Sequence, residues 1–282
     1  TNLYGASLHA ASASLVAWVP HYSNDTSSIH VWRKVGASWG LIGSRGFAPA
    51  PLGEDYRARV SMDGGTTWWS RPADGGLSRA PTVTFSEQTS TFPNLQLGSL
   101  FDVSANNSAW VPIVCDRTAG TNCGTGVVLE WLVDGGSRTI SAPTPSPLGG
   151  GVSRQHVVVS PDGRFLARLR PDTNEVFLWR NGVLVAPLSI PLSGYLNYSR
   201  LLAMSDDGNV VIVGYPRVVS TTPAGTNLDF YFWNGSSYVL GDVMSLGFMR
   251  PEHLALSGDG RVLAISGGSF ATDELHIYRR SS

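Results

Sequence analysis

One pattern of apolar and polar positions recurs along the chain: three apolar residues, a serine, any residue, Asp-Gly, and a second apolar run. The clearest copies are residues 157–167 and 254–264, and residues 202–212 follow closely. Asp-Gly favours the positive φ of a tight turn, and short flanks rich in β-branched residues are typical of strands. Each copy therefore predicts a β-hairpin. With three weaker copies included, the anchoring serines are Ser12, Ser61, Ser104, Ser160, Ser205 and Ser257.

A second pattern follows most of these hairpins, an alternating strand that ends in an aromatic residue and a polar turn. The second repeat lacks the aromatic end and offers only residues 82–86. Hairpin, third strand and a fourth strand after the turn make a four-stranded unit, and units of about 40–50 residues are typical of propeller blades. The copies of this third-strand pattern are residues 29–33, 128–131, 175–182, 230–235 and 274–279.

The predicted fold is all-β: a six-bladed β-propeller of four-stranded antiparallel blades, forming a single domain over residues 1–282. The last repeat ends at its third strand, so its fourth strand must come from elsewhere. Residues 2–7 are the expected donor, which closes the ring by pairing N- and C-terminal strands and removes an exposed sheet edge. Stretches rich in Pro and Gly, such as residues 142–151, are then loops between blades.

Three short motifs resemble known propeller families. Residues 159–163 (Val-Ser-Pro-Asp-Gly), followed by residues 176–179 (Val-Phe-Leu-Trp), resemble the WD-like repeats of TolB-type propellers. Residues 257–266 resemble bacterial FG-GAP-type repeats, and residues 61–68 match the Asp-box of sialidases and sortilin-like propellers. These resemblances imply a fold and no particular activity. The acidic pattern of calcium-binding FG-GAP repeats is absent, so we predict no metal ion and no other cofactor.

The charge and the apolar stretches of the chain exclude some classes of partner. The net charge is −1, with 20 basic and 21 acidic residues, which excludes a broad polycationic surface for nucleic acid. No apolar stretch reaches the roughly 18–20 residues of a membrane span.

The two cysteines and the sequons favour an oxidising compartment. Cys115 and Cys123 have no nearby histidine and fall short of the four ligands that zinc prefers, so we expect a disulfide across a loop tip. Disulfides form in secreted proteins and in the periplasm. We therefore expect a secreted or extracellular glycoprotein, with a periplasmic protein as the alternative. The N-glycosylation sequons begin at Asn24, Asn106, Asn197 and Asn234.

A set of arginines marks the candidate ligand-binding site. Arg71, Arg117, Arg170 and Arg217 each follow the second strand of a different repeat, and His21 takes this place in the first. In a propeller, the loop after the second strand opens on the face most used for binding. Arginine clusters recognise carboxylate, sulfate or phosphate through paired N–H donors. The alternative is a set of solvated rim arginines. Aromatic candidates for stacking on sugar rings are Tyr22, Tyr195 and Tyr215, with packing inside the fold as the expected role of most of them.

No catalytic residue is assigned, because the chain has no Gly-x-Ser-x-Gly elbow and no Gly-rich phosphate loop. The first hypothesis is a non-enzymatic binding or assembly module that recognises a glycan, a protein partner or copies of itself. A glycosidase- or lyase-like enzyme is the second; it requires two carboxylates, or a Tyr–carboxylate pair, converging with the arginines. A periplasmic TolB-like docking module is the third. The expected contact loops are residues 21–28, 71–79, 112–126 and 215–227.

Overall fold

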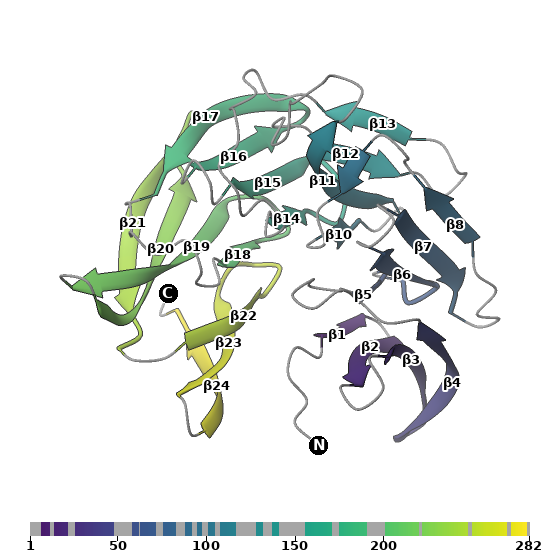
Figure 1. Ribbon diagram of the computed structural model, residues 1–282. Coiled ribbons are helices and arrows are strands. Elements are labelled where there is room, and N and C mark those ends of the chain that lie inside the picture. Colours follow the sequence, from purple (N-terminus) through teal and green to yellow (C-terminus); the bar gives the residue numbers. More distant parts are fainter. Residues whose placement is uncertain are drawn as a thin grey trace. The chain divides into compact units, whose positions relative to one another are not determined.

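A computed structural model covers the chain and describes about two thirds of it (Figure 1). Every regular element in the described part is a β-strand, and no helix there is long and apolar enough to cross a membrane. The described residues are 7–11, 14–21, 26–47, 58–61, 63–71, 76–82, 88–91, 95–97, 101–104, 108–116, 128–131, 137–140, 156–170, 175–190, 201–219, 222–247, 250–269 and 272–280.

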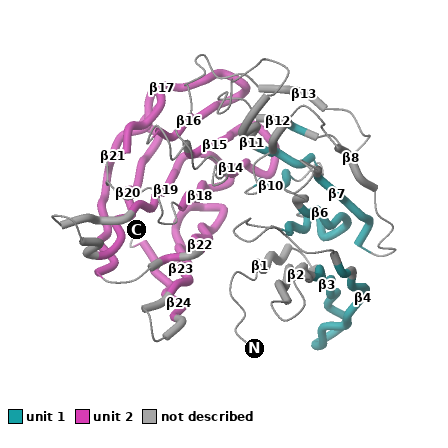
Figure 2. Tube along the Cα trace, viewed as in Figure 1, with its two compact units in different colours: residues 1–148, 152–155 teal, residues 149–151, 156–282 magenta. Residues whose placement is uncertain are grey.

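Two compact units divide the chain (Figure 2), and each is built from antiparallel sheets whose strands follow in chain order, except that β9 pairs with β11. The first unit comprises residues 1–148 and 152–155. Its first sheet contains β1 (Ser7–Ala11), β2 (Ser14–His21), β3 (Thr26–Val35) and β4 (Ser38–Phe47). Its second contains β5 (Ala58–Val60), β6 (Thr66–Arg71), β7 (Gly76–Pro81) and β8 (Gln88–Thr91). Its third contains β9 (Leu95–Leu97), β10 (Asp102–Val103), β11 (Ala109–Asp116), β12 (Val128–Trp131) and β13 (Ser137–Ile140).

The second unit comprises residues 149–151 and 156–282 and also holds three sheets among its described residues. Its first sheet contains β14 (His156–Val159), β15 (Phe165–Arg170), β16 (Glu175–Arg180) and β17 (Val183–Ser189). Its second contains β18 (Leu201–Met204), β19 (Val210–Val219), β20 (Thr222–Trp233) and β21 (Tyr238–Ser245). Its third contains β22 (Arg250–Leu256), β23 (Val262–Ser269) and β24 (Thr272–Arg279).

Successive sheets within each unit meet at the strand that begins the main path of each sheet, which is β10 in the third sheet. In the first unit β1 and β10 both contact β5, and in the second unit β14 and β22 both contact β18. Sheets that meander outward from a shared line of first strands are the arrangement of β-propeller blades. The two units therefore have the all-β, propeller-like architecture that the repeats predict.

All the predicted hairpins that lie in described residues are present as antiparallel strand pairs. One predicted third strand was wrong. The third strand of the second sheet is β7, not residues 82–86, because β7 already pairs with the whole of β6 and ends at a proline. The strand predicted from residues 2–7 falls outside the described residues, except for Ser7, which pairs with Trp18 in the first sheet.

The repeated Ser-x-Asp-Gly turn owes its shape to the serine hydroxyl. In the copy between β18 and β19, Ser205 Oγ donates to Asp207 Oδ1 (2.7 Å) and accepts from the amide of Val210 (2.9 Å). The Ser205 amide donates to the Val210 carbonyl (2.9 Å), and Asp207 Oδ1 accepts from the Asn209 amide (2.9 Å). Ser205 is 1% exposed, so these bonds satisfy a buried hydroxyl.

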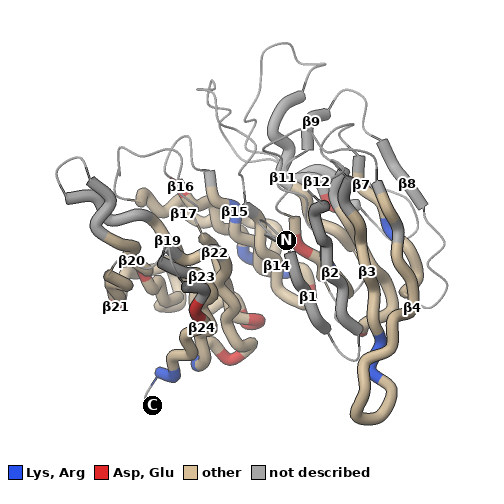
Figure 3. Tube along the Cα trace, turned by 60° about the horizontal axis from the view of Figure 1, so that its bottom comes forward, with Lys and Arg blue, Asp and Glu red and all other residues tan. Residues whose placement is uncertain are grey.

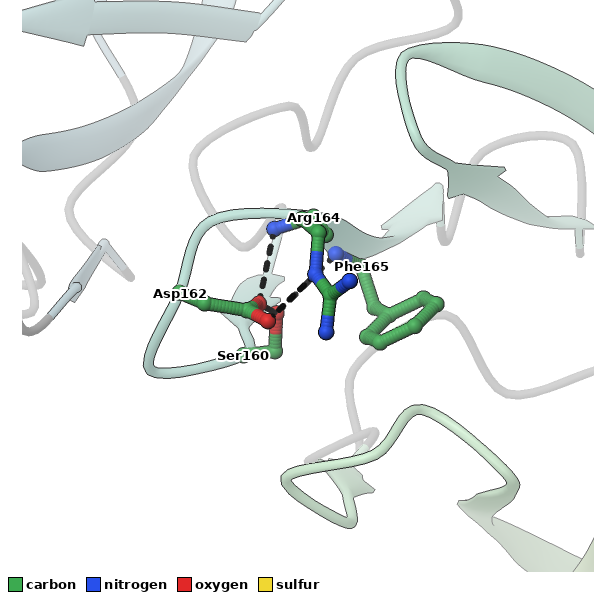
Figure 4. A network of polar contacts seen from close by, with 4 residues as sticks. All are labelled: Ser160, Asp162, Arg164 and Phe165. Carbon is green, nitrogen blue, oxygen red and sulfur yellow. Dashed lines mark hydrogen bonds and ion pairs between the residues drawn. The ribbon is translucent and has the colours of Figure 1, made fainter.

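The same bonds recur in three other turns, which shows that the motif and not its surroundings sets the geometry. Figure 4 shows the copy between β14 and β15, with the side chains of Ser160 and Asp162 turned toward each other and Arg164 beside them. In each turn the serine amide bonds to the carbonyl five residues on, which is the start of the second strand. The serines and the first residues of the second strands are Ser61 and Thr66, Ser160 and Phe165, Ser205 and Val210, and Ser257 and Val262.

An arginine joins two neighbouring sheets of the second unit beside one of these turns. The Arg180 guanidinium lies 4.4 Å from the ring centroid of Phe165 and 4.3 Å from that of Trp233. Its Nη1 donates to the carbonyl of Gly208 (2.8 Å) and to the Tyr238 hydroxyl (3.1 Å). Because Trp233, Gly208 and Tyr238 all belong to the next sheet, Arg180 ties β16 to that sheet.

Replacing Arg180 tests this tie. We expect Arg180→Ala to lower the free energy of unfolding by about 2–3 kcal/mol, from lost cation–π contacts and hydrogen bonds. Arg261→Ala is the matched control, since Arg261 is an exposed arginine at a turn, and it should change stability by less than about 0.5 kcal/mol. Urea denaturation measures both. Equal effects of the two replacements would contradict the role given to Arg180.

Replacing two glycines allows the free-energy cost of backbone strain to be measured separately from the cost of a steric clash. Gly182 (φ +76°) and Gly208 (φ +64°) share the left-handed conformation, but only at Gly208 would a Cβ meet another side chain, 2.4 Å from Phe165. We expect Gly182→Ala to cost about 1–2 kcal/mol. Gly208→Ala should cost about 1–3 kcal/mol more, because the methyl group overpacks the contact between sheets. Urea denaturation measures both variants, and equal losses in the free energy of unfolding would show that the contact between Gly208 and Phe165 has room for a methyl group.

Candidate functional site

The predicted arginines lie at the ends of second strands, opposite the Ser-x-Asp-Gly turns. Arg71 is the last residue of β6 and pairs with Gly76. Arg170 is the last residue of β15 and pairs with Glu175. Each is five positions after the first residue of its second strand, so the two arginines occupy the same register in their sheets.

The other predicted residues do not share this register. Arg217 is seven positions after Val210 and pairs with Gly225, and His21 is likewise seven positions after Ser14. Arg217 and His21 therefore lie two positions further along their strands than Arg71 and Arg170, because β2 and β19 are longer than β6 and β15. Arg117 lies outside the described residues, directly after β11. The side chains of His21, Arg71, Arg170 and Arg217 also lie outside the described part.

The connections at this end are shorter than the predicted loops. β3 begins at Thr26 and β7 at Gly76, which leaves residues 22–25 and 72–75 between the strands. The predicted loop 215–227 is mostly strand, because β19 continues to Val219 and β20 begins at Thr222. Between β11, which ends at Asp116, and β12, which begins at Val128, lie residues 117–127, outside the described part of the chain.

Tyr215 occupies, in β19, the register that Arg71 and Arg170 hold in their strands. It was predicted as a loop aromatic that either stacks on sugar or packs inside the fold, and it is a strand residue only 7% exposed. Its hydroxyl donates to Asp229 Oδ1 at 3.0 Å. The Tyr231 hydroxyl donates to Asp229 Oδ2 at 3.4 Å. The site therefore contains a buried carboxylate held by two phenols.

Asp229 was missed at the sequence level, although it is the one charged residue of the third strand β20 and directly precedes a run of aromatic residues. Asp229 is buried, with only 2% of its surface exposed to solvent. Burial raises the pKa of Asp229, and the hydrogen bonds from Tyr215 and Tyr231 oppose that rise. Burial and the nearby Asp229 carboxylate raise the pKa of Tyr231 to about 12.

The network is of the Tyr–carboxylate type that the enzyme hypothesis requires, but its location gives it another role. Asp229, Tyr215 and Tyr231 are buried in the sheet, and both tyrosines belong to the apolar core shared with sheet β14–β17. A carboxylate so enclosed does not contact a substrate directly. Its hydrogen bond with Tyr215 instead connects β20 to β19, the strand that carries Arg217. No group of three or more potential metal ligands occurs among the described side chains.

The remaining predicted sites lie mostly outside the described residues. Asn24, Asn106, Asn197 and Cys123 are in this category, and Cys115 is described only as a backbone position of β11. Asn234 is exposed in the turn between β20 and β21. Its side-chain carbonyl accepts hydrogen bonds from the amides of residues 236 and 237.

The pH dependence of stability distinguishes the buried carboxylate from those in the turns. Asp229 binds its proton more tightly in the folded state, so its contribution to stability falls as pH rises from about 4 through its folded pKa. For Asp207, burial raises the pKa, but hydrogen bonds from Ser205 and Asn209 outweigh that effect and lower it. Asp207 therefore adds stability above about pH 4, which is lost as pH falls through its lowered folded pKa.

These opposite signs define a paired experiment. Relative to the wild type, Asp229→Asn should become more stable as pH rises from 4 to 7. Asp207→Asn should become less stable as pH rises from 3 to 5. Urea denaturation across pH 3–7 measures both differences. The same sign for the two variants would contradict the environments described here.

Comparison with known proteins supports the fold. No protein-family profile and no curated protein sequence matches the chain. Among solved structures, it is similar to a putative 6-phosphogluconolactonase from Bacteroides fragilis, with a TM-score of 0.62 and 10% identity over 98% of this chain and 79% of that one. It is similar to a streptogramin B lyase, with a TM-score of 0.58 and 11% identity over 99% and 84%.

A third similar structure is a chain of the mitotic checkpoint complex, with a TM-score of 0.52 and 13% identity over 98% of this chain and 86% of that one. The three named proteins include a lyase, a putative lactonase and a member of a protein assembly. At such low identity the likeness concerns the fold alone. Together with the stacked antiparallel sheets, it identifies the chain as having a β-propeller-like fold.

Proposed function

We propose that this protein is a β-propeller binding module for an anionic partner, in the first place an acidic glycan. The observation that carries the proposal is the recurrence of an arginine near the end of the second strand. Arg71 and Arg170 hold the same register in two sheets, and Arg217 lies two positions further out in a third. Guanidinium groups pair with sulfate and carboxylate through parallel N–H donors, which suits such a ligand.

The distribution of charge along the second strands supports this choice of ligand. The turn at the start of the strand carries an exposed carboxylate in four sheets, and Arg164 and Arg261 accompany two of these. The opposite end carries the candidate arginines. With a net charge of −1 the chain has no general attraction for anions, and Figure 3 shows both basic and acidic residues in the described part. Selective binding would come from the arginine end of the strands. The exposed carboxylates are those of Asp63, Asp162, Asp207 and Asp259.

We propose further that the six described sheets are the blades of one closed propeller forming a single domain. Leu275 and Ile277 in β24 are 67% and 68% exposed, whereas Val176 and Leu178 hold the same register in β16 and are fully buried. These apolar side chains favour a covering sheet. Residues 2–6 are the proposed source of a fourth strand for sheet β22–β24.

We also propose the Cys115–Cys123 disulfide, N-glycosylation, and a secreted or extracellular location.

A glycan array tests the binding function. The array should include sulfated, sialylated and uronic-acid glycans beside neutral ones, probed with the wild type, Arg170→Ala, Arg217→Ala and the control Arg261→Ala. We expect selective binding of acidic glycans, reduced about tenfold or more by either of the first two replacements and unchanged in the control. Each lost charge-assisted bond accounts for a reduction of this size.

Two results would contradict the proposal. Absence of binding to every acidic glycan leaves a protein partner or self-assembly as the favoured function. Equal loss in Arg261→Ala would show that binding depends on total charge and not on the strand ends. A bound sugar that is recovered cleaved would instead support the glycosidase- or lyase-like alternative, which the burial of Asp229 disfavours.

A further inference from the structure

The ends of β19 and β20 that carry Arg217 form an extended arm. β19 and β20 are longer than the corresponding strands β15 and β16 of the preceding sheet. The arm is held on one side by the last residue of β21 and the residue that follows it. The Leu246 amide donates to the carbonyl of Thr226 (2.8 Å), and Ser245 Oγ donates to Asn227 Oδ1 (2.8 Å).

A close backbone approach strengthens that contact. Gly225, which pairs with Arg217, has a φ of +129°, and a Cβ on it would lie 1.4 Å from the carbonyl oxygen of Gly247. Only glycine allows the two backbones to come so close. The outer edge of the arm is therefore fixed against residues 245–247.

The Tyr215–Asp229 bond fixes the arm from within the sheet. Tyr215 is two positions before Arg217 on β19, and strand alternation places both positions on the same face. Asp229 pairs with Val213 on the neighbouring strand, so the bond runs diagonally from β20 to the root of the arm. Such a bond resists sliding and twisting of β19 relative to β20, beyond what the backbone ladder provides.

Three of the other sheets carry no carboxylate at the position of Asp229. The register of Asp229 is occupied by Phe177 in β16, His30 in β3 and Ser78 in β7. In the preceding sheet, Arg170 ends its strand at the register of Tyr215, so there is no arm to support. Asp229 therefore lies beside β19, the longest of the second strands described, which carries its arginine two positions further out than β6 and β15 do.

We propose that Asp229 is a positioning residue which, through Tyr215, holds the β19–β20 arm so that Arg217 is presented to the anionic partner. This inference rests on the proposed binding function. Burying a carboxylate costs free energy that an apolar pair of the same shape would avoid, and a hydrogen-bonded polar pair specifies one geometry in return. A fixed arm saves the ordering cost that a mobile arginine would incur on binding.

The first test uses hydrogen exchange and needs no ligand. Tyr215→Phe keeps the ring in the core and removes only the hydroxyl that reaches Asp229. Tyr231→Phe is the matched control, because it removes the other hydroxyl on the same carboxylate but leaves the root of the arm untouched. Amide exchange over residues 216–226 should become about tenfold faster in Tyr215→Phe and less than about twofold faster in the control. Residues 165–180 should exchange equally in both variants.

Equal acceleration in the two variants, or none in Tyr215→Phe, would overturn the anchoring role.

The second test measures binding of a size-defined heparin oligosaccharide by calorimetry. Tyr215→Phe should weaken binding about threefold to tenfold, and Tyr231→Phe by less than twofold. Faster exchange in Tyr215→Phe with unchanged affinity would overturn the positioning role. Absence of heparin binding by the wild type would count against the proposed function, while the exchange result would still decide whether Asp229 anchors the arm.

Discussion

The hydrogen bonds of one serine hydroxyl, buried in three of the four copies, underlie the order in each described Ser-x-Asp-Gly hairpin. That hydroxyl donates to the turn aspartate and accepts from the amide at the start of the second strand, as Ser205 does toward Asp207 and Val210. Both bonds are local in sequence, so the turn closes without help from the rest of the chain. Because the serine amide also pairs with the first residue of the second strand, the turn fixes the register of that strand.

Because the turn fixes where the second strand begins, the length of that strand determines where its last residues lie. β6 and β15 both end at an arginine five positions after their first residue, whereas β19 carries its arginine two positions further. The extra length of β19 would leave Arg217 on an unsupported extension. The contacts of Gly225 with Gly247 and of Tyr215 with Asp229 supply the support. Packing between sheets, including the Arg180 tie, then holds the turns and strands of the second unit in one arrangement.

The repeats made the hairpins predictable because their determinants are contiguous in the chain. Asp-Gly turns with apolar flanks identify first and second strands from a dozen residues, and the aromatic ends identify most third strands. The end of β19 was not predictable in this way, because it depends on pairing with β20 and on contact with residues 245–247. The hydrogen bond of Tyr215 was not predictable for the same reason. Its partner is 14 residues away and was recognisable only as the one charged residue of its strand.

The most direct test of the central claim is the salt dependence of glycan affinity. The account holds that arginines at the ends of second strands bind an anionic partner through ion pairing. A logarithmic plot of heparin-oligosaccharide affinity against salt concentration should therefore be steep for the wild type. Its slope should fall by about one to two units when Arg170 and Arg217 are both replaced by alanine. An unchanged slope in that double variant would show that the charge contacts lie elsewhere and would contradict the account.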